Sequence, residues 1–377
     1  MLLSNEEALR MINALRSGTS PINFSETILS GRDAEMDSFK RAIHMLGKGA
    51  GMVKLITGPF GVGKSLLVNT YKQAAINEDF IIASFQVNNG FRLNKIEDLY
   101  YAIMHNLYLK SKPNVKVSFE DIFDLWIENL QNAPVSDRKR FEVNTVCQEL
   151  SKYNMNYARA FLSFMRGRIQ RNQEMTNVSC AWITGEKNIP YELKQKYELV
   201  GAVDKTNTMD FLRAFIKLIT LLDYKGLVIF IDEIDQVTGE RSDLRQVGYN
   251  NLKHLIDLST SGEMKHVMFV FSGTESILLD KEKGIMSNIP LSQRLNLHPD
   301  QPLNSNENLI ILDTLGSEAL LELTEKILRL YQQCYRVNGP VDALSIFNET
   351  IASFNPSQDV TRHFVTRLIE KLDQLRR

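Results

Sequence analysis

The residues from Gly58 to Ser65 have the types and the spacing of a loop that can hold a polyphosphate. They read Gly-Pro-Phe-Gly-Val-Gly-Lys-Ser and fit the pattern G-x-x-x-x-G-K-[ST]. In such a loop the glycines let backbone N–H groups turn inward around the anion, and the following helix points its positive end at it. Lys64 is predicted to reach the β- and γ-phosphates, and Ser65 to offer its hydroxyl to Mg²⁺.

The predicted cofactors are therefore ATP and Mg²⁺, and the alternative is an ordinary glycine turn. An apolar run, Met52 to Ile56, precedes the loop and a helix-like run, Leu66 to Tyr71, follows it. This order of strand, loop and helix is the context that the pattern requires. The residues predicted to contact the nucleotide here are Gly58, Pro59, Phe60, Gly61, Val62, Gly63, Lys64, Ser65 and Leu66.

Asp232 and Glu233 form a second group that could do chemistry. They follow the apolar run from Gly226 to Ile231, which is typical of a buried strand that ends in acids, the Walker B pattern. Asp232 is predicted to hold Mg²⁺ directly or through water, and Glu233 to orient and polarise the attacking water. The alternative is a pair of ordinary surface acids. Because loop and acids supply two parts of one reaction, together they predict hydrolysis of ATP to ADP and phosphate.

A polar residue beyond the next strand could complete this chemistry. The apolar run from His266 to Phe271 is followed by Ser272, a glycine and Thr274. A side chain at this strand tip can hydrogen-bond the attacking water or the γ-phosphate, the role called sensor 1. Thr274 is the first choice and Ser272 the second, and an ordinary turn is the alternative for either.

The elements that must position these residues alternate between strands and helices. The run from Phe80 to Val87 is apolar on both faces, as a central strand of a parallel sheet should be. Ligands of open α/β sheets gather at the carboxyl ends of the strands, where Asp232 and Glu233 fall. The sequence therefore predicts an α/β fold with a doubly wound parallel sheet.

Further elements are predicted near the two ends of the chain. Ser4 and Glu7 have the spacing of a capping box at the start of a first helix. A second helix is expected at about residues 33–46, a last strand at Leu309–Leu312 and a closing helix at Val360–Leu375.

Composition restricts the class of protein. The 377 residues are 44% hydrophobic, which is enough for a core and suggests two or three domains. A net charge of −1 excludes a uniformly basic nucleic-acid coat. The three cysteines lack metal-ligand spacing and indicate a reducing compartment. No apolar run approaches the roughly 18 residues of a membrane helix, and the acidic start is unlike a signal peptide, so a cytoplasmic protein without a membrane partner is predicted.

Between about residues 112 and 200 no strand pattern stands out, and a helical insertion is predicted. Within it, residues 137–171 hold eight lysines or arginines against three acids. A solvated basic helix face is the commoner explanation of such a cluster. The alternative is a surface for double-stranded DNA or an acidic partner, because clustered positive charge on a neutral chain is typical of backbone contacts.

The chain as a whole resembles the P-loop ATP-binding proteins of bacteriophage exclusion (BREX) systems, which are AAA+ proteins akin to the origin-recognition initiators. The resemblance implies an AAA+ core with a helical insertion and a small C-terminal helical lid. It also implies ATP-dependent work in phage defence, as a homo-oligomer beside a helicase or methyltransferase. Besides the phosphate loop, it rests on Ala14–Gly18, Trp182–Glu186, Gly226–Asp235 and Pro290–Leu295.

Three arginines take their expected roles from this resemblance. Arg32 follows a glycine, as in the entry motif of many AAA+ proteins, and is expected near the nucleotide base. Arg294 lies where such proteins often carry an arginine finger that reaches the nucleotide of a neighbouring subunit. Arg362, in the first turn of the closing helix, is expected to touch the γ-phosphate as sensor 2. A packing or surface role is the alternative for each.

The expected organisation is an AAA+ core at residues 1–300, interrupted by the insertion at about 112–200, and a strand with a helical lid at 301–377. The expected function is that of an ATPase of prokaryotic anti-phage defence, acting on DNA or on a DNA-bound partner. Two alternatives stay open. One is a nucleotide-gated switch or scaffold, and the other is a replication-initiator or helicase-loader relative outside defence.

Overall fold

A seven-stranded sheet in the order β4-β3-β2-β5-β6-β1-β7 forms the centre of the molecule. The computed structural model describes residues 3–87, 90–132, 143–298, 301, 304–336, 341–352 and 360–376. Strands β2, β5, β6, β1 and β7 are parallel, and β3 and β4 continue the sheet in antiparallel pairs. The strands are β1 Gly51–Thr57, β2 Ile81–Gln86, β3 Leu107–Leu109, β4 Lys112–Val117, β5 Leu227–Asp232, β6 Val267–Ser272 and β7 Leu309–Ile311.

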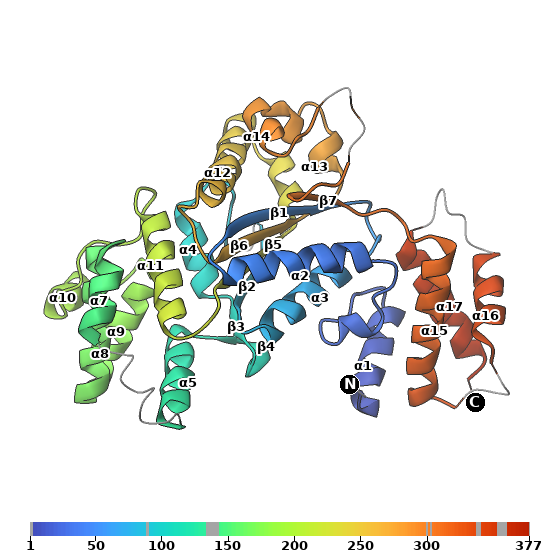
Figure 1. The fold of residues 1–377 in the computed structure, drawn as a ribbon, viewed down its shortest axis with the longest axis horizontal. Helices are drawn as coiled ribbons and strands as arrows, with labels where there is room; N and C mark the ends of the chain where they lie inside the picture. The colour runs from blue at the N-terminus through green and yellow to red at the C-terminus, as the bar shows by residue number, and fades with distance from the viewer. Residues whose placement is uncertain are drawn as a thin grey trace.

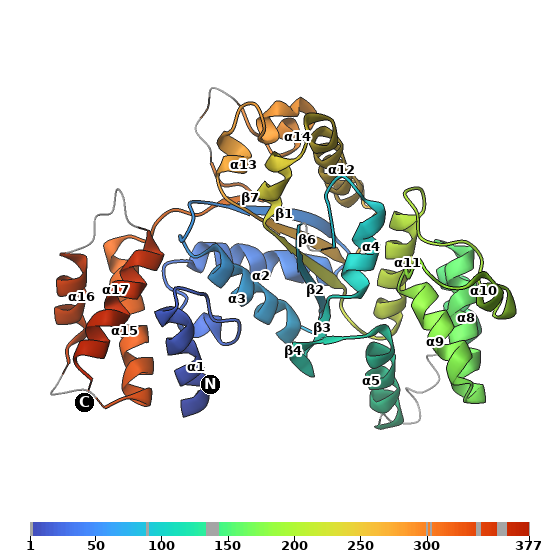
Figure 2. The same ribbon diagram turned by 180° about the vertical axis from the view of Figure 1, so that it is seen from behind.

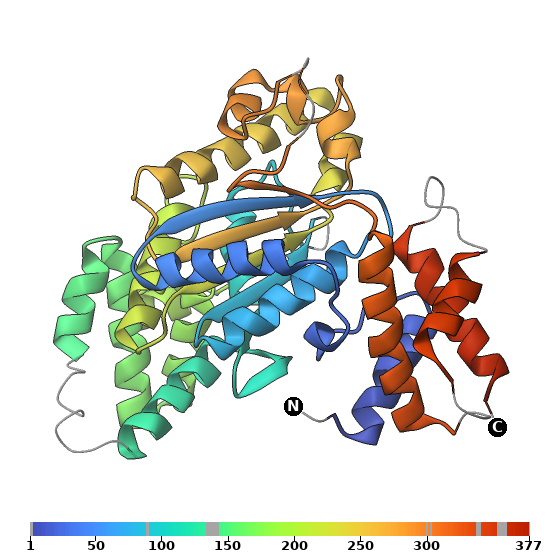
Figure 3. The same cartoon turned by 45° about the vertical axis from the view of Figure 1, so that its right-hand side comes forward.

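Helices cover both faces of the sheet, which confirms the predicted α/β fold with a parallel core. On one face α2 and α3 pack against alternate residues of the strands, such as Ile82, Val228 and Met268 (Figure 3). On the other face α4, α11 and α12 pack against the intervening residues. These helices are α2 Asp33–Gly47, α3 Lys64–Asn77, α4 Glu97–Met104, α11 Thr208–Leu221 and α12 Ser242–Thr260.

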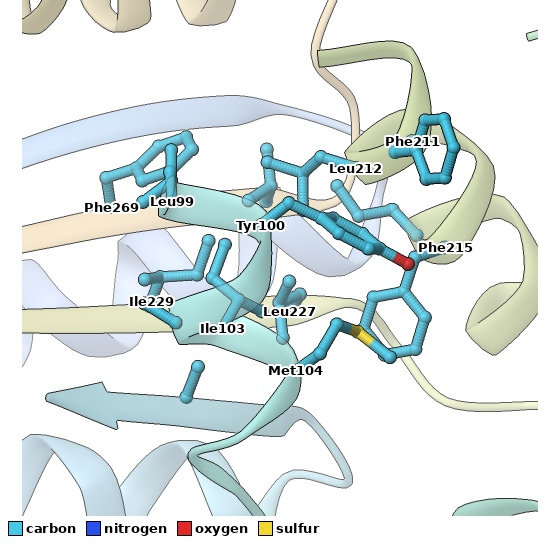
Figure 4. Close-up of a cluster of buried hydrophobic side chains, with 14 of the residues drawn as sticks. Leu99, Tyr100, Ile103, Met104, Phe211, Leu212, Phe215, Leu227, Ile229 and Phe269 are labelled. Atoms are coloured by element: carbon cyan, nitrogen blue, oxygen red, sulfur yellow. The ribbon is translucent and has the colours of Figure 1, made fainter. Parts of the chain in front are cut away.

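The predicted helical insertion lies beside the second face of the sheet (Figures 1 and 2). Tyr100 of α4 joins the two parts, because its hydroxyl donates a hydrogen bond to the Ile183 carbonyl at 2.8 Å. Figure 4 shows Tyr100 in the core between the sheet and α11, where Leu99, Tyr100, Ile103, Met104, Phe211, Leu212, Phe215, Leu227, Ile229 and Phe269 pack together. The insertion helices are α5 Phe119–Asn132, α7 Val143–Ser151, α8 Met155–Gln170, α9 Gln173–Ile183 and α10 Tyr191–Lys196.

Strand β4 corrects the expectation that residues 112–200 hold no strand. Five of its six residues are exposed, and only Val117 is buried. The strand pairs with β3 alone at the edge of the sheet. Because backbone hydrogen bonds rather than a buried face hold it, the sequence carries no period-two apolar signal there.

The C-terminal helices form a separate group with their own core, and α1 belongs to this group by packing. The predicted capping box of α1 is confirmed, since Glu7 N–H donates to Ser4 Oγ at 3.2 Å and Ser4 N–H donates to Glu7 Oε2 at 2.8 Å. Arg16 at the end of α1 pairs with Asp373 of α17 through two hydrogen bonds of 2.8 and 2.9 Å. The sequence had grouped residues 1–300 together, whereas α1 packs with helices 300 residues away. The helices are α1 Asn5–Arg16, α15 Ser317–Cys334, α16 Ala343–Ile351 and α17 Thr361–Gln374.

Short helices connect these parts of the structure. They are η1 Ser25–Thr27, η2 Ile234–Gly239, α13 Ser276–Leu279, η3 Ile285–Ser287 and α14 Ile289–Arg294. None of the helices in the described ranges is both long enough and apolar enough to cross a membrane.

Candidate nucleotide-binding site

A cavity of about 310 Å³ opens where the phosphate loop, the carboxyl end of β5 and the C-terminal helices meet. The loop and the start of α3 form its floor, and the acids after β5 form one wall. Residues between Leu15 and Arg32 form a second wall, and α15 and α17 contribute a third through Leu323, Arg362 and Val365. Segments that are distant in sequence therefore enclose one space.

The glycines of the loop are required by its backbone and by the chain that crosses it. Gly63, directly before α3, has a φ of 106°, a left-handed conformation that side chains rarely adopt. At Gly61 φ is 85°, and an added Cβ would lie 2.7 Å from Val360 Cγ2. The loop can therefore take this shape and still let the start of α17 rest on it.

Lys64, the first residue of α3, lies inside the loop. Its ammonium donates to the carbonyls of Gly58 at 2.7 Å and of Pro59 at 2.8 Å. Burial lowers the pKa of Lys64, and the charges of Asp235 and Asp232 oppose this shift. The lysine is thus a partly desolvated cation held next to the acids of the opposite wall.

Asp232 ends β5 with one carboxylate oxygen fixed by its neighbours. Its Oδ1 accepts hydrogen bonds from Ser272 Oγ at 2.6 Å and from the Glu233 N–H at 2.9 Å. Within the described residues, Asp232 Oδ2 and Ser65 Oγ have no hydrogen-bond partner in the protein, and both side chains line the cavity. Two such oxygen donors fit Mg²⁺, which takes few protein ligands and keeps waters or phosphate oxygens. A cation bound there would neutralise charge on the β- and γ-phosphates.

Glu233 stands at the mouth of the cavity on a left-handed backbone, with a φ of 59°. Gln236 Nε2 donates to one of its oxygens at 3.3 Å, and Gln86 Nε2 lies 3.5 Å from the other. The sequence reasoning missed both glutamines. Strand pairing could have identified Gln86, because it ends β2 directly opposite Asp232 of β5.

The two sensor 1 candidates lie at different depths. Thr274 lines the cavity, while Ser272 is buried beneath it and donates to Asp232. The Thr274 N–H donates to Asp235 Oδ1 at 2.9 Å, and its hydroxyl pairs with Ser276 at 2.7 Å. Asp235 itself lines the cavity, although the sequence reasoning gave it no role. Its position three residues after Asp232 was the only available signal.

Arg32 lines the cavity but is bound to the protein around it. Its Nη2 donates to the Asp313 carbonyl at 2.5 Å and to the Val62 carbonyl at 3.4 Å, and its Nη1 lies 3.5 Å from Glu35 Oε1. Burial lowers the pKa of Arg32. The side chain thus ties the phosphate loop to the segment that leads from β7 to α15.

Arg362 connects α17 to the phosphate loop. Its N–H donates to the Gly61 carbonyl at 3.0 Å, and its guanidinium lies 4.5 Å from the ring centroid of Phe60. The side chain also lines the cavity. The helix that carries the expected sensor 2 arginine is therefore docked on the loop.

Arg294 does not line this cavity. It ends α14, on a different part of the molecule from α17 (Figure 1). Its Nε donates to Asp257 Oδ1 of α12 at 2.6 Å, and Lys253 pairs with the same carboxylate. These two cations lower the pKa of Asp257. The acid lies 37 residues before the arginine, so the local sequence gave no sign of the pair.

The basic cluster of the insertion is partly neutralised by acids. Arg168 pairs with Asp124, and Arg166 lies 3.8 Å from Glu198. Arg159 is exposed and has no ion-pair partner in the part of the chain that the structure describes. The same holds for Arg171, and Lys152 pairs with Glu149. Three further basic residues, Arg138, Lys139 and Arg140, lie outside the described residues.

Solved structures similar to this chain include an ORC2 protein and a Walker-type ATPase. The ORC2 protein of Aeropyrum pernix, solved as ADPNP and ADP complexes, is 12% identical, with a TM-score of 0.45 over 92% of this chain and 62% of that one. A Walker-type ATPase of Pyrococcus abyssi is 11% identical, with a TM-score of 0.44 over 92% of this chain and 68% of that one. The chain thus spans less than two thirds of the first structure's length. No curated protein matches the sequence.

A protein-family comparison covers nearly the whole chain. Residues 3–377 match the model described as BREX system ATP-binding protein BrxC/D. The match confirms the resemblance inferred from the phosphate loop and the motifs around it. No cluster of three or more metal-ligating side chains occurs in the described ranges. The chain belongs to the BrxC/D family of BREX system ATP-binding proteins.

Proposed function

We propose that this protein is a Mg²⁺-dependent ATPase of a BREX anti-phage defence system. Family membership supports ATP binding, and hydrolysis is the step that we add. The observation that carries it is that Lys64 and Ser65 line one cavity with Asp232 and Glu233. Groups for holding the phosphates, the cation and the attacking water are therefore within one space.

The residues around the cavity have separate roles in this proposed reaction. The N–H groups of the loop and the ammonium of Lys64 hold the phosphates, and Lys64 exchanges its carbonyl contacts for phosphate oxygens. Ser272 and the Glu233 N–H fix one oxygen of Asp232, so that the other faces the cation. Glu233, held by Gln236, accepts a hydrogen bond from the attacking water and so orients it.

Phosphate release tests this proposal. Wild-type protein should release phosphate from ATP with Mg²⁺ and stop when EDTA is added. Lys64→Ala should lose most nucleotide affinity and activity, because it removes the cation of the loop. Lys116→Ala is the matched control, since Lys116 is exposed on β4 and does not line the cavity. Hydrolysis that survives both EDTA and Lys64→Ala would refute the assignment.

One observation favours a second candidate, a nucleotide-gated switch. Arg362 joins α17 to the phosphate loop through Gly61 and Phe60, directly beside the cavity. A bound nucleotide would contact both sides of this junction, so nucleotide binding could determine the position of the C-terminal helices. The two functions differ in whether turnover is needed, and a hydrolysis-deficient variant that keeps biological activity would favour the switch.

A finer part of the proposal concerns the target, which we take to be double-stranded DNA or a DNA-bound partner such as a helicase or methyltransferase. Arg159 and Arg171 support a DNA surface, because both are exposed and unpaired within the described ranges. The ion pairs of Arg166 and Arg168 weaken it. Changing Arg159 and Arg171 to glutamine should lower affinity for all DNA sequences and reduce the salt slope by about one unit per lost contact. An unchanged salt titration would remove DNA from the proposal.

A further inference from the structure

A second cavity, of about 370 Å³, is lined by α3 residues from Asn69 to Asn77, beyond the α3 residues Lys64 to Leu66 that line the nucleotide cavity. Its walls are α3, Ile82 and Ser84 of β2, the β3–β4 hairpin and the loop residues Ile22 and Asn23. It shares no lining residue with the nucleotide cavity. Whatever it binds would therefore not compete directly with ATP.

The charges on this wall are all positive. Lys72 and Lys110 line the cavity, and no aspartate or glutamate does. The Lys110 ammonium already has protein partners, because it donates hydrogen bonds to Asp79 at 2.9 Å and to the Asn77 carbonyl at 3.0 Å. Lys72 has no ion-pair or hydrogen-bond partner in the described ranges. Its ammonium lies 5.7 Å from the centroid of the Phe230 ring.

The Lys72 side chain is half-buried, so its ammonium is partly desolvated. Burial lowers the pKa of Lys72, and only the charge of Asp232 acts in the opposite direction. A contact with an aromatic ring compensates part of this desolvation, and no carboxylate of the described residues pairs with the ammonium. An anion in the cavity would give Lys72 the partner that the protein does not supply.

The neutral groups of the wall are also available to a ligand. Asn69 and Gln73 each use one side-chain atom to hold the segment from Pro21 to Phe24, through bonds of 3.1 and 3.0 Å. Their remaining amide atoms have no protein partner in the described ranges. The same is true of the side chains of Asn23, Asn77, Asn114, Ser84 and Tyr108, which line the cavity. Carboxamides offer both donors and acceptors, so they suit a polar ligand.

We propose that this cavity binds a small organic anion, with its phosphate or carboxylate group on Lys72 and its neutral polar atoms on the carboxamides. An apolar ligand would leave the amides unpaired, and a cation would meet two ammonium groups. The site is separate from the reaction proposed above. Its test can therefore succeed or fail whether or not the protein hydrolyses ATP.

Calorimetry on the full chain tests the proposal, with the nucleotide cavity saturated by a non-hydrolysable ATP analogue and Mg²⁺. Inorganic phosphate, succinate and AMP serve as probes. At least one should bind once per chain, and the comparison of phosphate with succinate identifies the charged group. Lys72→Met should weaken this binding at least about tenfold, since a charge-assisted hydrogen bond is lost. Lys116→Met, which removes a nearby exposed charge outside the cavity, should bind as wild type does.

The proposal is overturned if none of the three probes binds at millimolar concentration, or if Lys72→Met binds them as tightly as wild type. Thermal unfolding gives a second readout in case Lys72→Met does not fold. The probe that binds should then raise the Tm of wild type but raise it less in Asn114→Ala, which removes one wall carboxamide. Equal increases in both proteins would also contradict the site.

Discussion

At the scale of single residues, Ser272 has a more specific place than a strand-end serine suggests. It is buried and donates a 2.6 Å hydrogen bond to the same Asp232 oxygen that the Glu233 N–H contacts. The other oxygen of Asp232, a residue that lines the cavity, has no hydrogen-bond partner in the described ranges. Removing a residue that orients a metal ligand in this way commonly weakens metal binding by 10- to 100-fold.

We therefore predict that Ser272→Ala raises the Mg²⁺ concentration needed for half-maximal ATP hydrolysis by about tenfold. Activity at saturating Mg²⁺ should fall much less, because Glu233 is untouched. A titration of phosphate release against Mg²⁺ measures both quantities. Thr274→Val is the matched control, since the Thr274 hydroxyl contacts Ser276 and not Asp232. Equal Mg²⁺ requirements for Ser272→Ala and wild type would show that the hydrogen bond is not needed.

The sequence predicted residues whose chemistry is written into a local pattern, such as Lys64 and Asp232. It missed Asp235, Gln86 and Gln236, because their roles depend on which strand tips meet at the edge of the sheet. It also ranked Thr274 above Ser272 without knowing that one faces the cavity and the other faces Asp232. The order of residues at the end of a strand does not show how deeply each side chain is buried.

At the scale of elements, α1 belongs to the C-terminal helices through contacts that no local pattern reveals. Its apolar face joins their core, and Arg16 reaches Asp373 of α17. The amphipathic pattern predicted the helix itself but not its partner. Strand β4 is the opposite case, since its exposed residues gave no pattern and only pairing with β3 makes it a strand. Local elements followed from periodicity, and their distant partners did not.

Arg16→Met should loosen α1 from this group. Hydrogen exchange in Asn5–Arg16 is expected to rise several-fold, because the variant keeps the apolar stem and removes both bonds to Asp373. Arg10→Met is the control, since Arg10 pairs with Glu6 within α1 and both side chains are exposed. If exchange in α1 were the same in both variants, the contact with α17 would not hold the helix.

The same pair predicts a dependence on pH. Arg16 lowers the pKa of Asp373, so the pair contributes its full stability above the ordinary aspartate pKa of about 3.9. This contribution is lost as the pH falls through the lower pKa of the folded protein. Exchange in α1 should therefore rise in wild type as the pH is taken below about 4, after correction for the intrinsic rate, and rise less in Arg16→Met. An equal increase in both proteins would exclude Asp373 as the group responsible.

At the scale of the whole molecule, we propose that subunits share the catalytic site. Arg294 lies outside its own subunit's cavity and is exposed, with Asp257 as its partner. Surface ion pairs are weak, so a neighbour's γ-phosphate could replace Asp257. An arginine supplied in this way contributes about 10³ to 10⁵ in rate.

Mixing two inactive variants tests this sharing. Arg294→Ala subunits keep an intact phosphate loop, and Lys64→Ala subunits keep the arginine, so each alone should hydrolyse ATP poorly. A mixture should recover part of the wild-type activity, because some sites then combine both intact halves. If Arg294→Ala alone has full activity at every protein concentration, Arg294 serves only its bond to Asp257.

The central claim, that this cavity hydrolyses ATP, is tested most directly by Glu233→Gln. The change keeps the shape of the side chain and its place beside Gln236, while removing the charge that polarises water. ATP affinity and turnover should be measured on the same preparation with Mg²⁺. The variant should bind ATP about as tightly as wild type does, and its turnover should fall by at least about a hundredfold. Wild-type turnover in Glu233→Gln would contradict the central claim.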